Sequence, residues 1–196
     1  MVSTSCLEVL LKNYHYTSAI EAGLPFVSFR PQYIYGKKSN KWDYIDWYFD
    51  RLVRGEPLAI PAPGTQKVSL TNSEDVAELL ASVLNDEAAA VEQTFFNCGT
   101  DQLVTYDEVA KMCSEVAGVD LNIQHYDASL GKANFPFRLT DFYVSPDTAK
   151  SKLSYGGAKN TLKDDLSWYY ESYKARGGVS KEMSFAEDKE VLVAKA

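Results

Sequence analysis

Short apolar segments alternate with longer amphipathic segments along most of this chain, and glycine or proline ends many of them. The apolar segments have the length and composition of β-strands and cover residues 26–30, 67–70, 93–97 and 121–126. The amphipathic segments have apolar residues at helical spacing and cover residues 5–22, 42–54, 71–84, 105–117, 145–156 and 161–174. Strands that alternate with helices over short connections form parallel sheets, so the sequence predicts an α/β fold with a mostly parallel sheet.

Capping residues mark where three of these helices begin. Thr105 is followed three residues later by Glu108, which is the spacing of a capping box. Thr71 or Ser73 is placed to cap the helix that ends near residue 84, and Thr161 is placed to cap the final helix. These residues make the helix starts the most specific part of the secondary-structure prediction.

Length and cysteine content limit the class of protein. A chain of 196 residues buries about 70% of its unfolded surface, which is enough for one core, and no apolar run approaches the roughly 20 residues of a membrane span. Three cysteines are too few for a disulfide framework, so we expect a soluble protein of a reducing compartment. The two histidines, His15 and His125, leave no histidine-rich metal site, and we predict no metal.

Acidic and basic residues are unevenly distributed. The net charge of −7 and the pI near 4.9 argue against a general polyanion binder. Residues 68–127 carry 12 acidic residues and one basic residue, whereas residues 1–67 and 128–196 each have a net charge of +2. Either the acidic residues form solvated helix faces, or the two flanking segments share a surface that faces an anionic ligand.

Motifs that mark common nucleotide-binding and catalytic sites are missing from the sequence. It contains no G-x-G-x-x-G loop, no P-loop, no G-x-S-x-G elbow and no C-x-x-C or H-E-x-x-H motif. Tyrosine precedes lysine by four residues at Tyr33/Lys37, Tyr155/Lys159 and Tyr170/Lys174. The first pair lies across a turn, the second spans two glycines and the third lies near the C-terminus, so we predict no catalytic residue.

A family resemblance starts at residues 29–36, Phe-Arg-Pro-Gln-Tyr-Ile-Tyr-Gly. They resemble the strand-to-loop motif of the extended short-chain dehydrogenase/reductases, the NAD-dependent epimerase/dehydratase group. Further motifs follow in order, namely Trp47-Tyr-Phe-Asp-Arg51, Phe96-Asn97-Cys98, His125-Tyr126-Asp127, Phe135-Pro-Phe-Arg138 and Phe142-Tyr143. Together they resemble the chloroplast stem-loop-binding proteins, atypical members of that superfamily that are associated with plastid RNA.

That resemblance implies the C-terminal part of a Rossmann-like parallel sheet with a small substrate-side lobe. The first strand–helix–strand units of the family, which supply the glycine-rich loop and the acidic ribose-binding residue, have no counterpart in this sequence. We therefore expect a partial domain over residues 1–178 and a charged, partly ordered tail over residues 179–196. No cofactor is expected on this chain alone, and NAD only if an N-terminal half is present.

Residues 30–41 supply most of the candidate ligand contacts. Arg30 and Pro31 end a predicted strand, and open α/β folds bind ligands at the carboxyl ends of their strands; the alternative is a purely structural strand end. The resemblance makes Pro31 and Tyr33 the candidate cofactor-binding residues. The other candidates for contact with a ligand or RNA are Arg30, Tyr35, Lys37, Lys38, Lys41, Arg51, Arg54 and His125.

The lysines of this segment lie close in sequence to three aromatic residues, Trp42, Tyr44 and Trp47. A basic and aromatic cluster of this kind can hold phosphates and stack bases, and the alternative is a solvated loop above an amphipathic helix. Arg51 and Arg54 belong to the same predicted helix. His125 is either a hydrogen-bonded structural residue, or a residue that faces a ligand or takes part in RNA cleavage.

Three functions follow from these observations. The first is a plastid RNA-binding factor of the chloroplast stroma, acting on RNA or as a subunit of a larger assembly. The second is a fragment of an NAD-dependent nucleotide-sugar epimerase or dehydratase. The third is a non-catalytic structural subunit, with other protein subunits covering the open edge of its sheet. The sequence alone leaves open whether the chain is an enzyme.

Overall fold

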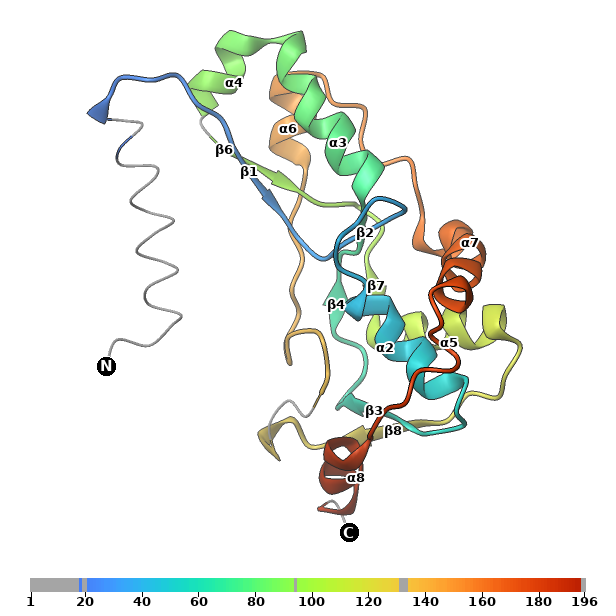
Figure 1. Cartoon of the computed structure of the whole chain (residues 1–196). Helices are drawn as coiled ribbons and strands as arrows, with labels where there is room; N and C mark the ends of the chain where they lie inside the picture. The colour runs from blue at the N-terminus through green and yellow to red at the C-terminus, as the bar shows by residue number, and fades with distance from the viewer. Residues whose placement is uncertain (1–17, 19–20, 94, 131–133, 195–196) are drawn as a thin grey trace.

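The computed structural model describes residue 18 and residues 21–93, 95–130 and 134–194, which form an elongated molecule with two regions (Figure 1). The helix predicted over residues 5–22 falls mainly outside these described residues. Near one end, three helices pack around a pair of strands, and we call this part the sheet region. The remainder, built around three longer helices and containing the other strand pairs, is called the aromatic lobe. No helix among the described residues combines the length and the apolar composition that a membrane span requires.

Eight short strands form four two-stranded pairs among the described residues. The parallel pairs are β1 (Ser28–Pro31) with β6 (Phe95–Cys98), β2 (Ile34–Tyr35) with β5 (Thr71–Asn72), and β3 (Leu58–Pro61) with β8 (Ile123–Tyr126). The antiparallel pair is β4 (Lys67–Val68) with β7 (Val104–Thr105). The prediction of an α/β fold with mostly parallel pairing is therefore confirmed.

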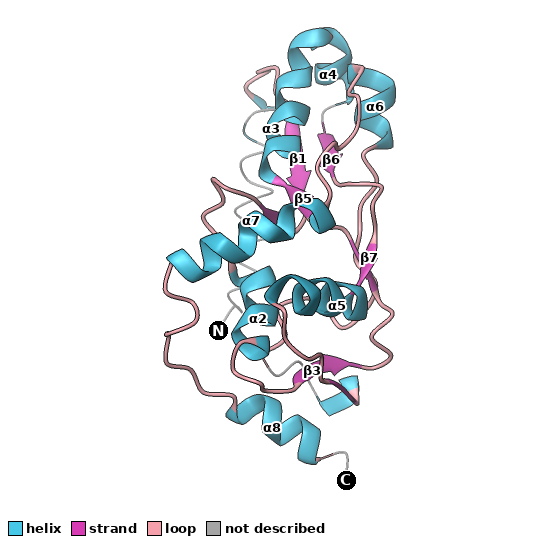
Figure 2. Ribbon diagram, turned by 90° about the vertical axis from the view of Figure 1, so that its right-hand side faces the viewer, coloured by secondary structure: helices cyan, strands magenta, loops and turns pink. Residues whose placement is uncertain are grey.

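Helices cover these strand pairs (Figure 2). Those of the sheet region are α3 (Ser73–Ala81), α4 (Glu87–Gln93) and α6 (Asp147–Leu153), with the 3₁₀ turn η1 (Ser82–Asn85) between α3 and α4. Those of the aromatic lobe are α2 (Asp43–Leu52), α5 (Tyr106–Ala117), α7 (Leu162–Ala175) and α8 (Ala186–Val193), with the 3₁₀ turn η2 (Ala128–Leu130) after β8.

Two apolar cores lie inside the molecule. In the sheet region, side chains from α3, α4, α6 and β6 pack on one face of the β1–β6 pair, and its buried members are Leu79, Ala90, Phe96, Cys98, Ala149, Leu153 and Tyr155. In the aromatic lobe, α2, α5 and α7 surround a larger core of 20 buried residues. Aromatic rings dominate this core, for example Tyr48, Phe49 and Phe137, which are fully buried. The lobe therefore buries far more apolar surface than the sheet region.

Side-chain caps mark the starts of three helices among the described residues, α3, α5 and α7. The capping box predicted at Thr105 is confirmed, because its hydroxyl accepts from the Glu108 N–H while the Glu108 carboxylate accepts from the Thr105 N–H. Thr161 caps α7 as predicted. The prediction that Thr71 or Ser73 caps α3 is wrong: Thr71 belongs to β5, and the side chain of Asn72 accepts from the Glu74 N–H instead.

Several elements were not predicted, and β3 and α8 are the two that most change the expected arrangement of the chain. β3 lies in the proline-rich stretch of residues 57–63, for which no strand was predicted, and its residues pair with β8 in register, for example Ile60 with His125. α8 lies within residues 179–196, the segment predicted as a charged, partly ordered tail. Its Asp188 is buried against α2, which fixes the helix to the aromatic lobe. The predicted domain division itself remains a prediction.

The β2–β5 pair has a direct consequence for function. Its register places Ile34 beside Thr71 and Tyr35 beside Asn72. The loop that follows β2 therefore lies next to the first turn of α3, at the boundary between the two regions. This loop contains three of the predicted contact residues, Lys37, Lys38 and Lys41.

Candidate functional site

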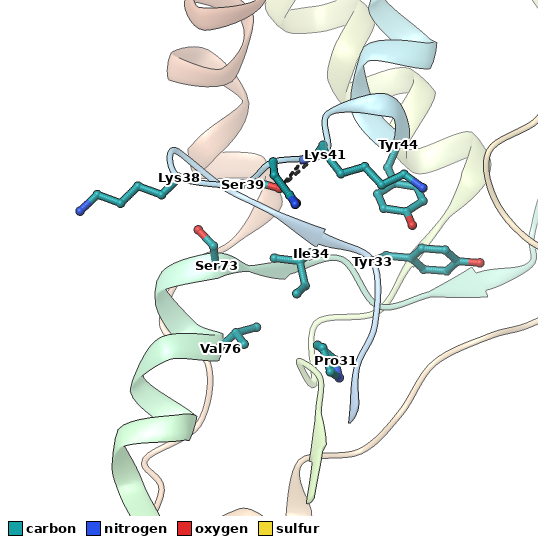
Figure 3. A pocket seen from close by; sticks show the side chains of 10 residues that line it. Pro31, Tyr33, Ile34, Lys38, Ser39, Lys41, Tyr44, Ser73 and Val76 are labelled. Atoms are coloured by element: carbon teal, nitrogen blue, oxygen red, sulfur yellow. Dashed lines mark hydrogen bonds between the residues drawn. The ribbon is translucent and has the colours of Figure 1, made fainter. Parts of the chain in front are cut away.

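A cavity of about 560 Å³ lies at the boundary between the sheet region and the aromatic lobe (Figure 3). β1, β2 and α3 form one side of it, while the loop after β2 and the start of α2 form the other. The side chains that line the cavity are those of Pro31, Tyr33, Ile34, Lys38, Ser39, Asn40, Lys41, Tyr44, Ser73 and Val76. The structure thus brings together four of the predicted contact residues, Pro31, Tyr33, Lys38 and Lys41.

The loop over residues 36–41 is shaped by a glycine and a serine. Gly36 has a φ of 144°, and a Cβ added to it would lie 2.1 Å from Ser73 Oγ, so the loop approaches α3 as closely as only glycine permits. Further along, the Ser39 hydroxyl donates to the Lys41 carbonyl at 2.9 Å and accepts from the Lys41 N–H at 3.2 Å. These contacts fix the backbone that carries the lysines.

The cavity has a positive wall and an apolar wall. Lys38 and Lys41 lie on the loop side, and Figure 3 shows Ser73 and the apolar side chains of Ile34 and Val76 on the opposite side. None of the described residues that line the cavity is acidic. In a chain with a net charge of −7, such a cavity favours an anionic ligand with an apolar or aromatic body.

Tyr33 forms part of the cavity wall in a strained conformation. Its φ of 40° lies in the left-handed region that non-glycine residues rarely adopt. Edge-to-face packing holds its ring, with centroids 4.9 Å from both Tyr44 and Phe137, and its hydroxyl accepts from the Arg138 N–H at 3.2 Å. Burial raises the pKa of the Tyr33 hydroxyl, so the group stays protonated. Strain of this kind concentrates at functional sites.

Tyr35 lies beneath the loop and has a structural contact. Its hydroxyl donates to Asp165 Oδ2 at 2.7 Å, and the Asn72 amide donates to the same oxygen at 2.8 Å. The other oxygen, Oδ1, accepts from Trp168 Nε1 at 2.9 Å. Burial and the adjacent carboxylate both raise the pKa of Tyr35. The predicted ligand contact Tyr35 therefore joins β2 to α7.

Two predicted contacts, Lys37 and Arg30, are neighbours of cavity residues in the sequence. Lys37 is exposed, and its Nζ lies 5.6 Å from the centre of the Trp168 ring. Arg30 is exposed at the end of β1, with its guanidinium carbon 4.2 Å from the centre of the Phe95 ring. Neither lines the cavity, but Arg30 directly precedes Pro31, which does.

The structure places Arg51 and Arg54 away from the cavity. Arg51 is 3% exposed and bonds Asp188 through Nε at 2.7 Å and through a second nitrogen at 3.1 Å. Arg54 donates to the carbonyls of Asp50 and Gly178, both at 2.8 Å. Both guanidinium groups therefore tie the C-terminal segment to α2, and neither belongs to the candidate site.

His125 lies on β8 in the aromatic lobe and is also remote from the cavity. Its Nε2 is 3.0 Å and 3.1 Å from the two carboxylate oxygens of Asp107, and both side chains are about one-third exposed. A Cβ on Gly64 would lie 2.4 Å from that nitrogen, so the loop after β3 packs closely over the pair. This geometry joins β8 to α5 and matches the structural alternative for His125.

Several cavity residues were not selected from the sequence. Ile34, Ser39, Asn40, Ser73 and Val76 line it because the β2–β5 pairing places the loop against α3. The helix start near residue 73 was visible in the sequence, but its neighbour in space was not. Among the described residues, no group of three or more histidine, cysteine, aspartate or glutamate side chains is placed to hold a metal ion.

Comparison with known proteins supports the fold described above. Residues 7–99 match the model of the NAD dependent epimerase/dehydratase family. Among solved structures, UDP-glucuronic acid 4-epimerase from Bacillus cereus aligns with a TM-score of 0.68 and 16% identity, over 90% of this chain and 53% of that chain. The PbgP3 protein from Burkholderia pseudomallei aligns with a TM-score of 0.63 and 21% identity, over 89% of this chain and 53% of that chain. The fold is therefore Rossmann-like, as predicted.

Sequence comparison gives a more specific relative. The chloroplast stem-loop binding protein of 41 kDa b from Arabidopsis thaliana is 34% identical over 176 residues, which cover 87% of this chain and 45% of the relative. The predicted resemblance to these proteins is confirmed. This chain spans about half the length of the curated and solved relatives that it matches.

NAD is implied by the epimerase family, so we asked whether the described residues fit it. Pro31 and Tyr33 supply only one wall of the cavity. Gly36 is packed against Ser73, and the described residues include no glycine-rich loop between a strand and a helix that would hold a pyrophosphate. The residues present therefore do not form a dinucleotide site by themselves.

Proposed function

From this similarity to a chloroplast stem-loop binding protein, we propose that the chain is an RNA-binding factor of the plastid. The observation that carries the proposal is the cavity at the boundary of the two regions, whose described lining is cationic, partly aromatic and free of carboxylates. In this function Lys37, Lys38 and Lys41 contact phosphates, while Pro31, Tyr33 and Tyr44 face the nucleoside. Arg30 extends the contact along the end of β1.

The lysines and the aromatic rings suit the two chemical parts of a nucleotide. An ammonium group is a point charge that neutralises a phosphate, and a base can lie against an aromatic or apolar wall. Tyr44 already carries a cation, because Lys41 Nζ lies 4.8 Å from the centre of its ring. A volume of about 560 Å³ is within the range of small-molecule sites and accommodates a nucleotide.

The acidic residues elsewhere in the chain restrict the expected contact with RNA to the surroundings of the three lysines. The acidic residues 68–127 repel a polyanion, so few phosphates are neutralised and affinity depends on the three lysines. Each lysine–phosphate contact contributes about −0.7 to the slope of log K against log salt on single strands. The expected slope is therefore shallow, near −2.

Binding of a fluorescent stem-loop RNA, measured by anisotropy over a range of salt concentrations, tests the proposal. Replacing Lys37, Lys38 and Lys41 together by alanine should abolish most of the affinity and reduce the slope by about 2. The matched control replaces the exposed Lys111, Lys152 and Lys163, which changes net charge equally but leaves the cavity intact. Equal losses in both variants, or no binding by the wild-type chain at physiological salt, would refute the proposal.

Protein partners form a further part of the proposal. Among the described strands β1 pairs with β6 and with no other strand, and the edge of a sheet is a place where another strand can pair. We place the chain in a larger plastid assembly in which another subunit or segment covers this edge. Copurification of the native protein as a lone monomer would contradict this part.

The epimerase or dehydratase function is the second candidate, because Pro31 and Tyr33 line the cavity and residues 7–99 match that family. It requires an additional N-terminal half that supplies the glycine-rich loop, with NAD bound across the two halves. A chain extended by such a half should gain thermal stability with excess NAD. An unchanged melting temperature would eliminate this candidate.

A further inference from the structure

A cluster of rings and cations lies beside the cavity, where the loop after β2 meets α7. Trp42 and Trp168 are both half-buried, and the buried ring of Tyr169 contacts both, with centroids 5.3 Å and 5.5 Å away. A cation lies over each tryptophan: Lys37 Nζ is 5.6 Å from the Trp168 ring centre, and Arg176 Cζ is 3.9 Å from that of Trp42. We call these five residues the aromatic ridge.

We propose that the aromatic ridge binds unpaired nucleotides of the RNA by stacking their bases. The inference rests on the proposed RNA-binding function and adds to it the part of the RNA that is recognised. Aromatic side chains flanked by cations are the usual platform for single-stranded nucleic acid. In an A-form duplex the bases are stacked on each other and cannot reach such rings, so a loop or single strand is the matching ligand.

Both tryptophans are held in place before any ligand arrives. Trp168 Nε1 donates to Asp165 Oδ1 at 2.9 Å, and Arg176, stacked on Trp42, donates to both carboxylate oxygens of Asp46 at 2.8 Å and 2.9 Å. Fixed rings lose little conformational entropy when a base stacks on them. Lys37, in contrast, lies near the outer limit of cation–π distance and is exposed, so it can move from the ring to a phosphate.

The carboxylates near the ridge do not oppose an RNA strand strongly. Asp46 is paired with Arg176, and Asp165 accepts hydrogen bonds from Tyr35, Asn72 and Trp168. Three exposed acids lie within four residues of Trp42 or Trp168 in the sequence. Asp43 lies 3.9 Å from Lys41 Nζ, Glu171 lies 2.7 Å from Lys174 Nζ, and Asp164 accepts from the Thr161 hydroxyl at 2.7 Å. Each of these five carboxylates therefore has a cation or a hydrogen-bond donor as its partner.

Trp47, the third tryptophan of the sequence, provides an internal reference. The sequence placed it in the basic and aromatic cluster, but the structure buries it to 5% exposure in the core of the aromatic lobe. Its ring packs against Tyr48 and Phe135 and carries the Arg51 guanidinium. Its fluorescence should therefore not respond to RNA.

The test compares two RNAs and two variants by fluorescence anisotropy. One RNA is a hairpin with an unpaired loop, and the other is a blunt duplex with the same stem. Trp168→Ala should weaken binding of the hairpin by roughly 5- to 150-fold, Trp168→Phe should weaken it less, and neither should change binding of the duplex. Circular dichroism checks that both variants are folded.

A measurement on the wild-type chain keeps the proposal testable if Trp168→Ala does not fold. Acrylamide quenching of tryptophan fluorescence should fall when the hairpin binds, because Trp42 and Trp168 become covered, and a Trp47→Phe variant should show the same fall. Hairpin binding with unchanged quenching would refute the ridge but leave the RNA function standing, and so would a folded Trp168→Ala variant that binds the hairpin as the wild-type chain does. Failure of the wild-type chain to bind either RNA would refute the RNA function itself.

Discussion

The sheet region and the aromatic lobe bury their apolar side chains to different extents. The lobe has 20 buried residues in one core, nine of them aromatic, whereas the core of the sheet region has seven. Exposed large apolar side chains occur in both regions, for example Leu84 at 76% in the sheet region and Val193 at 72% in the lobe, so the difference lies in the cores. Because burial of apolar side chains is the main stabilising contribution, we expect the lobe to be the more stable of the two regions.

Because the site lies between the two regions, one of its sides packs on the larger core of the lobe and the other on the smaller core of the sheet region. Tyr33 and Tyr44 pack onto the aromatic core, while Ser73 and Val76 belong to α3 in the sheet region. Ligands commonly bind at such boundaries, because residues from two packed units converge there. Substitutions that affect one region more than the other should therefore reveal how far the two fold together.

The largest expected effect is in the lobe, at the buried pair of Arg51 and Asp188. Arg51→Ala leaves the Asp188 carboxylate buried without its partner and should lower the free energy of unfolding by about 3–5 kcal/mol in urea denaturation. Lys189→Ala is the control, because its exposed pair with Glu56 contributes less than about 1 kcal/mol. Similar losses in the two variants would show that the C-terminal segment does not stabilise the lobe.

A substitution at Gly36 tests how closely the loop after β2 packs against α3 at the boundary between the two regions. Gly36→Ala places a Cβ 2.1 Å from Ser73 Oγ and 3.0 Å from the Ser73 nitrogen, so it should lower the unfolding free energy by about 1–3 kcal/mol and weaken RNA binding. Gly55→Ala is the control, since its φ is also positive but a Cβ there meets nothing within 4 Å.

A second substitution, at Ser73, tests whether Gly36→Ala loses stability because its Cβ contacts Ser73 or because alanine disfavours the positive φ of this position. If contact causes the loss, the double variant Gly36→Ala/Ser73→Gly should recover part of it in the same urea experiment. A Gly36→Ala variant no less stable than Gly55→Ala would contradict the close approach of the loop to α3.

A smaller difference is expected between two helix caps, one in each region. Thr105→Ala removes the cap of α5 and should cost about 1 kcal/mol. Asn72→Ala removes the cap of α3 and also the hydrogen bond to Asp165, so it should cost about 1 kcal/mol more. Asn72→Asp keeps the cap but loses the amide donor. If it is as stable as the wild-type chain in thermal denaturation, the link from α3 to α7 contributes nothing.

The smallest effect is a difference in labelling rate between two buried cysteines. Cys98 belongs to the core of the sheet region and Cys113 to that of the lobe. Burial raises the pKa of Cys98 to about 11 and that of Cys113 further, so both thiols are protonated and unreactive at pH 8 until the structure opens.

In a Cys6→Ser variant, maleimide labelling in low urea, followed by mass spectrometry, should modify Cys98 several-fold faster than Cys113. Below the ordinary thiol pKa of 9.0, the rate should rise with pH as the opened thiols ionise. Equal rates at every urea concentration would mean that the two regions unfold as one unit.

The sequence predicted features that depend on nearby residues. Periodicity predicted α2, α5 and α7, and the spacing of Thr105 and Glu108 predicted a cap that the structure contains. β3 was missed because it contains Pro61 and is flanked by Pro57 and Pro63, and a stretch so rich in proline resembles a loop. Pro61 is tolerated there because it ends a strand whose pairing among the described strands is with β8 alone.

Charge patterns predicted the candidate site only in part. The lysine loop was identified because its basic and aromatic residues are adjacent in the sequence. Arg51 and Arg54 were grouped with it by their helix, but the structure turns both toward the C-terminal segment. Trp168 was not considered, since nothing near it in the sequence indicates that it lies beside Lys37.

By itself, then, the sequence determined the α/β class, the main helices, the lysine loop and the resemblance to chloroplast stem-loop-binding proteins. Only the tertiary structure decided which of the basic residues are available to a ligand and which rings accompany them. The physical reason is the distance along the sequence between the residues that interact. Caps and periodicity act over a few residues, whereas Arg51 and Asp188 are 137 residues apart and meet only when the whole lobe has packed.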